Sequence, residues 1–265
     1  MLITSREYKL TLQHREFAAG TTAVDGFWQE LKDLTETLEI VTDGSLKLSE
    51  ERSIQFLDTP DASVRSNGLL LRRRVDNKSK EFQYTLKCRS PDRYLAAATD
   101  VRGAQAFDFK EKLEEDITSP FASRFSHSAT VTVPAHGGAD NKFKTIGDAA
   151  KMFSVLGDLR RDGMRCPLET ALLPVNNLEV RERVFSGGNL LLDGENAEAA
   201  LIFWSIGQQK RLVVAEFSFR YKNKQEDYSG NCTRAAMQLF RAVQRTDWFE
   251  SAGATKTEFL YGDIA

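Results

Sequence analysis

Residues 211–221 read RLVVAEFSFRY, and this stretch shows the pattern that decides the fold. Its apolar side chains recur at every second position: Val213, Ala215, Phe217, Phe219 and Tyr221. Because side chains along a β-strand alternate between its two faces, these residues share one apolar face. The opposite face carries Glu216 and Arg220. An apolar face of this size needs a cover, and we expect helices to supply it.

The same parity gathers charge on one face of almost every other strand candidate. The members are Glu7 and Lys9; Arg72 and Arg74; Lys87 and Arg89; Lys112, Glu114 and Asp116; and Arg181 and Arg183. Two architectures fit this pattern. In the first, the charged faces are solvated and the apolar faces form the core. In the second, the charged faces line the bore of a barrel whose apolar outer face is covered by helices. Such a bore could hold both a phosphate chain and a divalent cation.

Periodicity predicts the remaining elements. Strands are predicted at 2–12, 51–58, 68–75, 81–89, 107–117, 177–185, 200–206, 211–221 and 255–261, and helices at 22–38, 145–158 and 230–246. Residues 118–142 are rich in Ser, Ala, Pro and Gly and are expected to form a loop or insertion, and 187–199 carry turn signals. With no β-α-β alternation, this order predicts an α+β fold of one domain over residues 1–265. Closing the sheet into a barrel would remove its edges.

Composition limits the function classes. The 265 residues include 36 basic and 38 acidic ones, and the net charge of -2 gives no global attraction to nucleic acid or membrane. Any anion site must therefore come from local clusters of cations. Three widely spaced cysteines favour neither a disulfide scaffold nor a zinc site. Without an 18-residue apolar run or a signal-peptide pattern, the expected location is the cytoplasm.

Several segments together resemble the CYTH family, the triphosphate tunnel metalloenzymes. They are SREYK at 5–9 (ExExK in the family), FLDTPD at 56–61 and GLLLRRR at 68–74 (YFDTPD…GLALRLR), YTLK at 84–87 (TLK), KLEED at 112–116 (RxExE), EFS at 216–218 (ExE) and TKTE at 255–258 (a closing lysine strand). The segments follow the family order and span nearly the whole chain. The run DTPD…LLLRRR…TLK is the most specific of them.

The resemblance implies a closed antiparallel eight-stranded β-barrel, or tunnel, with helices packed on the outside, and Mg²⁺ or Mn²⁺ as cofactor. Metal ligation falls on Glu7, Glu114, Asp116 and Glu216, and catalysis on Glu7, Glu216 and Lys87. Substrate binding falls on Lys9, Arg72, Arg74, Lys87, Lys112, Arg181, Arg183 and Lys256. The family pattern is incomplete where Ser5 and Ser218 replace carboxylates and where 200–206 read AALIFWS. The set of cations is therefore complete, whereas the set of carboxylates is thinned.

The leading functional hypothesis is metal-dependent hydrolysis of a triphosphate, either inorganic triphosphate or an organic one such as thiamine triphosphate. Adenylate cyclisation is a further branch of the same family. The alternative is a non-catalytic module that binds polyphosphate or nucleotide with a degenerate metal site. A plain structural barrel without a ligand is the third reading. The expected partner is a small molecule that contains a triphosphate, with no nucleic acid and no membrane, and a homodimer is one of the open oligomeric states.

Overall fold

The computed structural model describes residues 1–79, 81–134, 143–251, 253 and 255–262. The strands are β1 (Ile3–Leu12), β2 (Val41–Asp58), β3 (Leu69–Asp76), β4 (Phe82–Ser90), β5 (Phe109–Thr118), β6 (Ala122–Val133), β7 (Arg160–Arg161), β8 (Met164–Arg165), β9 (Leu173–Pro174), β10 (Val180–Leu192), β11 (Glu195–Ile206) and β12 (Arg211–Lys222). The helices are η1 (His14–Phe17), α1 (Thr21–Thr37), α2 (Ser63–Ser66), α3 (Arg93–Ala98), α4 (Ile146–Ala150), η2 (Ser154–Asp158), η3 (Val175–Asn177), α5 (Gly230–Val243) and α6 (Lys256–Tyr261).

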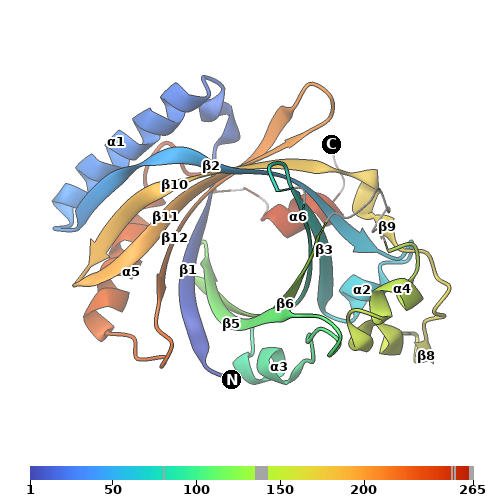
Figure 1. The fold of residues 1–265 in the computed structure, drawn as a ribbon. Helices are drawn as coiled ribbons and strands as arrows, with labels where there is room; N and C mark the ends of the chain where they lie inside the picture. Colours follow the sequence, from blue (N-terminus) through green and yellow to red (C-terminus); the bar gives the residue numbers. More distant parts are fainter. Residues whose placement is uncertain (80, 135–142, 252, 254, 263–265) are drawn as a thin grey trace.

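One large sheet dominates the fold and curves into a ring (Figure 1). The strand order is β10-β11-β12-β1-β5-β6-β4-β3-β2-β9, and a further pairing joins β10 to β2. The α+β class and the outer helices are confirmed, but the described residues give a ten-stranded sheet, so the count of eight strands is not confirmed. The sheet is also not purely antiparallel, because β1 pairs with β5 in parallel.

Helices α1 and α5 cover the outer face of β1, β10, β11 and β12 (Figure 1). From Ala215 to Tyr221 the apolar stripe of β12 lies in this core, with Phe217 and Phe219 fully buried. Helix α1 contributes Trp28, which donates a hydrogen bond from Nε1 to the carbonyl of Gly44 at 3.0 Å. A Cβ on Gly188 would lie 2.3 Å from the Trp28 ring, so this close approach requires glycine at 188.

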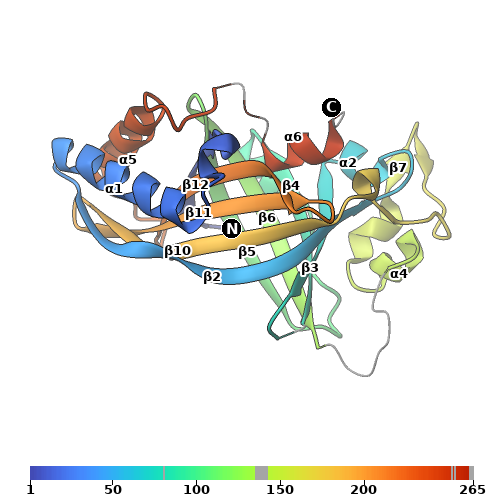
Figure 2. The same ribbon diagram turned by 90° about the horizontal axis from the view of Figure 1, so that it is seen from above.

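Three smaller apolar clusters complete the packing, and the smallest of them includes Ile3, Ala96 and Leu113. Outside the ring, α4 and η2 cover β3, β4 and β6, where Leu71 and Leu86 are fully buried. A further cluster lies on the inner face of the ring and includes Ile54, Trp204 and Leu260. Leu260 belongs to α6, which lies toward one end of the ring (Figure 2).

Three sequence predictions about elements need correction. The segment 118–142 is not a loop throughout, because β6 occupies Ala122–Val133; residues 135–142 lie outside the described part. The turn signals at 187–199 are wrong except near Asp193, since β10 runs to Leu192 and β11 begins at Glu195. The strand at 255–261 is instead α6, which begins with a capping box between Thr255 and Glu258.

The other differences concern boundaries. The helix predicted at 145–158 is divided into α4 and η2, and the strand predicted at 51–58 begins earlier, at Val41. Among the described residues, no helix has both the length and the apolar character needed to cross a membrane.

Candidate functional site: a charged bore

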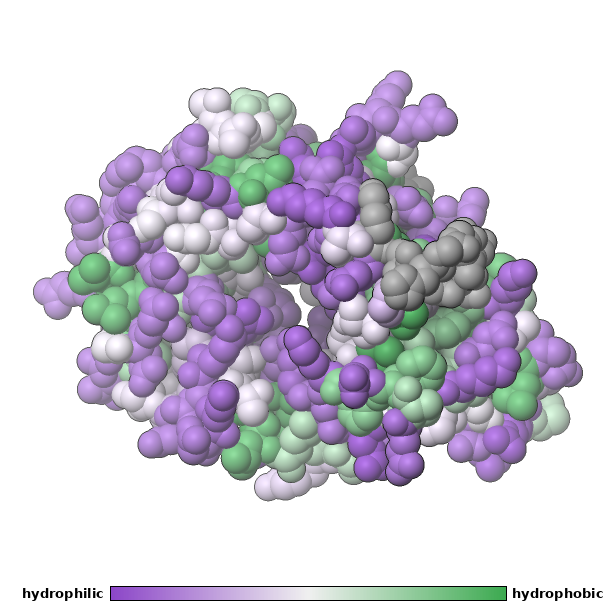
Figure 3. All heavy atoms as spheres, viewed as in Figure 1, coloured by the Kyte–Doolittle hydropathy of each residue, from purple (hydrophilic) through white to green (hydrophobic). Residues whose placement is uncertain are grey.

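The middle of the ring is hollow, and hydrophilic residues border the opening (Figure 3). Along most strands the apolar side chains pack into the outer cores. The polar side chains at the alternate positions therefore face the opening. The inner side chains include Ser5, Glu7 and Lys9 of β1, Arg52 of β2, Arg72 and Arg74 of β3, Thr85, Lys87 and Arg89 of β4, Lys112, Glu114 and Asp116 of β5, Ser126 of β6, Glu182 of β10, Trp204 of β11, and Glu216 and Ser218 of β12. Of the two architectures that the sequence left open, the structure has the second.

Three arginines on the neighbouring strands β2 and β3 form what we call the cationic wall: Arg52, Arg72 and Arg74. The buried carboxylate of Glu182 lies between two of them, 3.2 Å from Arg52 and 3.4 Å from Arg74. Its second oxygen accepts a hydrogen bond from the Trp204 indole at 2.8 Å. Burial opposes the charge of Glu182, but Arg74 and the other nearby cations prevail and lower its pKa to about 2.

Arg72 differs from its neighbours because no carboxylate in the described part of the chain pairs with it. Its guanidinium donates a hydrogen bond to the Thr85 hydroxyl at 3.3 Å, and its Nε has no acceptor among the described residues. Burial, followed by the charge of Arg74, lowers the pKa of Arg72 to about 9, with Glu182 acting in the opposite direction. Arg72 is still charged at neutral pH, so the cationic wall carries positive charge that the protein does not neutralise locally.

Asp116 is the centre of a second group. Its carboxylate is 3% exposed and lies 2.8 Å from Lys9, 3.3 Å from Lys87 and 3.6 Å from Arg89. It also accepts a hydrogen bond from Ser126 at 2.7 Å. Burial raises the pKa of Asp116, but these cations outweigh it and hold the pKa well below its usual range.

Lys87 belongs to this group, and burial together with the neighbouring cations lowers its pKa. Burial lowers its pKa most, and Arg89 and Lys9 lower it further. The attraction of Asp116 compensates only in part, so the pKa of Lys87 falls to about 7. The ammonium form of Lys87 is therefore under-stabilised in the absence of a further anion.

The four carboxylates expected to bind metal all face the bore from β1, β5 and β12, and we call them the carboxylate wall: Glu7, Glu114, Asp116 and Glu216. Each already has a cationic partner. Lys9 lies 3.0 Å from Glu7 as well as 2.8 Å from Asp116, and Lys112 lies 2.6 Å from Glu114. Lys256 reaches Glu216 from α6 at 2.9 Å.

This pairing bears on the Mg²⁺ or Mn²⁺ site implied by the resemblance. No group of three or more acidic, His or Cys side chains among the described residues is arranged to hold a metal ion. Ser5, in place of a carboxylate, donates a hydrogen bond to Glu114 at 2.8 Å, and Ser218 is paired with Lys9 in the strand register. As arranged, the carboxylate wall binds lysines and does not fit a resident metal centre.

The predicted placement of Arg181 and Arg183 in the bore is wrong. Both have the parity of Phe185, which packs into the outer core. Arg181 pairs with Glu51, and the guanidinium of Arg183 lies 5.5 Å from the centre of the Phe203 ring. The inner residue of this segment is the intervening Glu182.

The sequence prediction did not include Arg52, Glu182 or Trp204. Glu182 stands between two arginines, so the alternating pattern could have been assigned to either face. Lys256 was expected on a strand, and although it lies on α6 it still reaches the bore, 5.5 Å from the centre of the Trp204 ring.

No family model and no curated protein matches this chain. Several solved structures do. One is an adenylyl cyclase candidate from Hippeastrum, described as having a dominant triphosphatase activity, with a TM-score of 0.48, 12% identity, and 97% of this chain and 95% of that chain covered. Another is an adenylate cyclase candidate from Bacillus halodurans, with a TM-score of 0.45, 11% identity and 98% of each chain covered. A protein from Pyrococcus horikoshii has a TM-score of 0.41, 10% identity and 97% of each chain covered.

Proposed function

We propose that the bore binds the triphosphate group of a small molecule. The observation that carries this proposal is Arg72, a cation inside the ring without a carboxylate partner in the described structure. Guanidinium groups bind phosphate oxygens through charge-assisted hydrogen bonds. A bound polyanion would neutralise Arg72 and would stabilise the ammonium form of Lys87.

The spread of the cations favours a chain of phosphates over a single one. Arg52, Arg72 and Lys87 lie on three consecutive strands, and neighbouring strands are about 4.8 Å apart. The cations thus cover roughly 10 Å across the inner face, a span longer than one phosphate group. They lie inside the ring, so the partner we propose is a small molecule, not a nucleic acid or a membrane.

Metal-free calorimetry tests this proposal directly. The titrants are inorganic triphosphate, pyrophosphate, phosphate and sulfate, in buffer that contains EDTA. We expect the affinity to rise with the number of phosphates and sulfate to bind weakest. Equal affinity for triphosphate and sulfate, or no binding of either, would contradict a site built for a phosphate chain.

Hydrolysis of the bound triphosphate is a second candidate, favoured by the carboxylate wall that faces the same bore. Enzymes that transfer phosphoryl groups act mainly by positioning the chain and offsetting its charge, and the cations here are suited to both. Because the described residues assemble no metal centre, a divalent ion would have to arrive with the substrate.

Phosphate release separates an enzyme from a binding module. Inorganic triphosphate, ATP and thiamine triphosphate are incubated with Mg²⁺ or Mn²⁺, and with EDTA as the control, while cyclic AMP is measured in the ATP samples. Metal-dependent phosphate release that is lost in Arg72→Ala would identify a triphosphatase, and cyclic AMP would identify a cyclase. Binding without turnover would leave the non-catalytic module as the function.

A further inference from the structure

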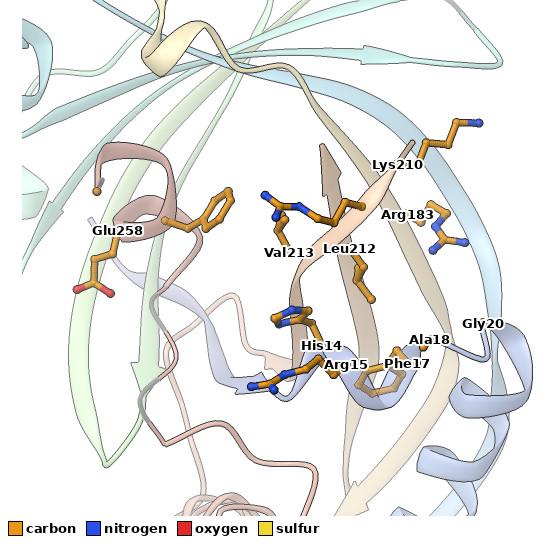
Figure 4. Close-up of a pocket in the computed structure, with 13 residues that line it drawn as sticks. His14, Arg15, Phe17, Ala18, Gly20, Arg183, Lys210, Leu212, Val213 and Glu258 are labelled. Carbon is orange, nitrogen blue, oxygen red and sulfur yellow. The ribbon is translucent and has the colours of Figure 1, made fainter. Parts of the chain in front are cut away.

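A second cavity, of about 950 Å³, is lined by none of the three arginines of the cationic wall. It is bordered by η1, β10, the turn between β11 and β12, the first residues of β12, and α6 (Figure 4). In Figure 4, His14 and Arg15 lie beside the strand that carries Leu212 and Val213, and Glu258 lies across the cavity from them. This volume is within the range of pockets that bind metabolites and cofactors.

Among the described residues, the side chains that line this cavity carry more basic groups than acidic ones. One carboxylate lines it, that of Glu258, and the basic side chains are His14, Arg15, Arg183, Lys210 and Arg211. Glu258 is already engaged, because its carboxylate accepts the backbone N–H of Thr255 at 2.8 Å. No hydrogen bond or ion pair to a carboxylate is found for the side chains of Arg15, Lys210 and Arg211 within the described ranges.

The pKa of His14 also responds to the positive charges around it. Partial burial lowers its pKa, and Arg15 and Arg211 lower it further, whereas Glu250 acts in the opposite direction. Arg15 and Arg211 therefore both lie close enough to His14 for their charges to act on it. An anion bound beside His14 would be attracted by both guanidinium groups.

The remaining wall of the cavity is apolar and partly aromatic. Phe17, Leu212, Val213 and Phe259 all border it, and Phe17 is buried in the outer core. A cavity that joins unpaired cations to an aromatic wall suits a ligand with a phosphate at one end and a flat ring system at the other.

We propose that this cavity is a second ligand site, distinct from the bore, which binds a phosphate ester of a planar ring system, such as a nucleoside monophosphate. Arg15 and Arg211 hold the phosphate, and Leu212 and Phe259 provide the surface for the ring. The proposal does not depend on a triphosphate binding in the bore, because no residue of the cationic wall lines this cavity.

The test is a calorimetric titration of AMP at fixed ionic strength. Its variants are Arg15→Ala/Arg211→Ala in the cavity, Arg72→Ala in the bore, and Lys47→Ala/Lys151→Ala as a control that removes two exposed positive charges elsewhere. We expect the Kd of AMP to rise about tenfold or more in the cavity variant, because it loses charge-assisted contacts with the phosphate. In the bore variant and the control, the Kd should stay within about twofold of the wild-type value. Saturating inorganic triphosphate should leave AMP binding in place.

Three results would overturn the proposal. The first is that the wild-type protein does not bind AMP. The second is that Arg72→Ala or inorganic triphosphate abolishes AMP binding, since the nucleotide would then occupy the bore. The third is that ribose 5-phosphate binds as tightly as AMP, because the aromatic wall would then contribute nothing.

Discussion

The cationic wall and the carboxylate wall of the bore differ in how completely they are neutralised. Every carboxylate of the second wall has a lysine within 3.3 Å, and Asp116 has three cations around it. On the cationic wall, Arg52 pairs with both Glu50 and Glu182, and Arg74 shares Glu182 with it. Arg72 has no carboxylate at all among the described residues.

The difference indicates which kind of ligand the bore lacks. A carboxylate that is already paired with an ammonium group must give up that contact to bind a divalent cation. An unpaired guanidinium can bind an anion without breaking an existing contact. The free protein is therefore prepared for a polyanion to a greater degree than for a metal ion.

The largest expected effect comes from the most heavily paired residue. Asp116→Asn removes the charge that holds Lys9, Lys87 and Arg89 together, so we expect the free energy of unfolding to fall by about 3 kcal/mol. Urea unfolding measures this change. The matched control is Asp158→Asn, whose ion pair with Arg165 is exposed and should contribute at most about 1 kcal/mol. Equal effects would show that the pairs in the bore are no more important than surface pairs.

Lys9 determines whether the carboxylate wall can bind metal. Lys9→Met leaves Glu7 and Asp116 without the ammonium group between them, so Mn²⁺ should bind about tenfold more tightly or better than in the wild type. Mn²⁺ titration followed by electron paramagnetic resonance measures this affinity. Lys222→Met, which removes an exposed partner of Glu198, is the control. If Mn²⁺ binding does not change, Glu7 and Asp116 do not offer a latent metal site.

The lowered pKa of Lys87 predicts that anion binding takes up a proton. The pKa is about 7 without ligand, and a bound polyanion raises it. Above pH 7 the affinity for triphosphate should therefore fall with rising pH, by at most about tenfold per unit. Calorimetry in buffers of different ionisation enthalpy counts the protons. Lys87→Arg, which keeps the charge, separates this uptake from protonation of the triphosphate itself, and an unchanged proton count in that variant would rule out Lys87.

The smallest effect is expected for the arginines that face outward. Arg183→Ala should change the Kd of triphosphate by less than about twofold, because its guanidinium lies near the rings of Phe185 and Phe203 in the outer core. The same titration measures it. A loss comparable to that of a bore arginine would mean that β10 presents its other face to the ligand.

The sequence was sufficient for the parts of the bore where each strand separates charge from apolar residues. On β4, Leu86 is buried outside and Lys87 and Arg89 face inward, as alternation predicts. On β10, Arg181, Glu182 and Arg183 place charge on both faces, so alternation alone could not assign the inner one. The role of Glu182 depends on the pairing of β10 with β2, a contact between distant segments that no local pattern contains.

Two other misses have local causes. The inner face of β6 consists of small hydroxyl residues such as Ser126, Ser128 and Thr130, and a Ser-rich composition is also typical of loops. At 255–258, in contrast, the sequence carries a capping box formed by Thr255 and Glu258, which is a signal for a helix start. The strand was predicted there from the family resemblance, and the structure has a helix instead.

The most direct test of the central claim is the affinity of Arg72→Ala for inorganic triphosphate, measured by metal-free calorimetry together with its stability in urea. The account predicts that binding weakens by about 1.5–3 kcal/mol, the scale of a hydrogen bond to a charged group. Stability should stay the same or rise, because a positive charge without a carboxylate partner is removed from a crowded set of arginines. Unchanged affinity, or unfolding of the variant under conditions where the wild type is stable, would contradict the claim that Arg72 is kept for an anion that the protein itself does not supply.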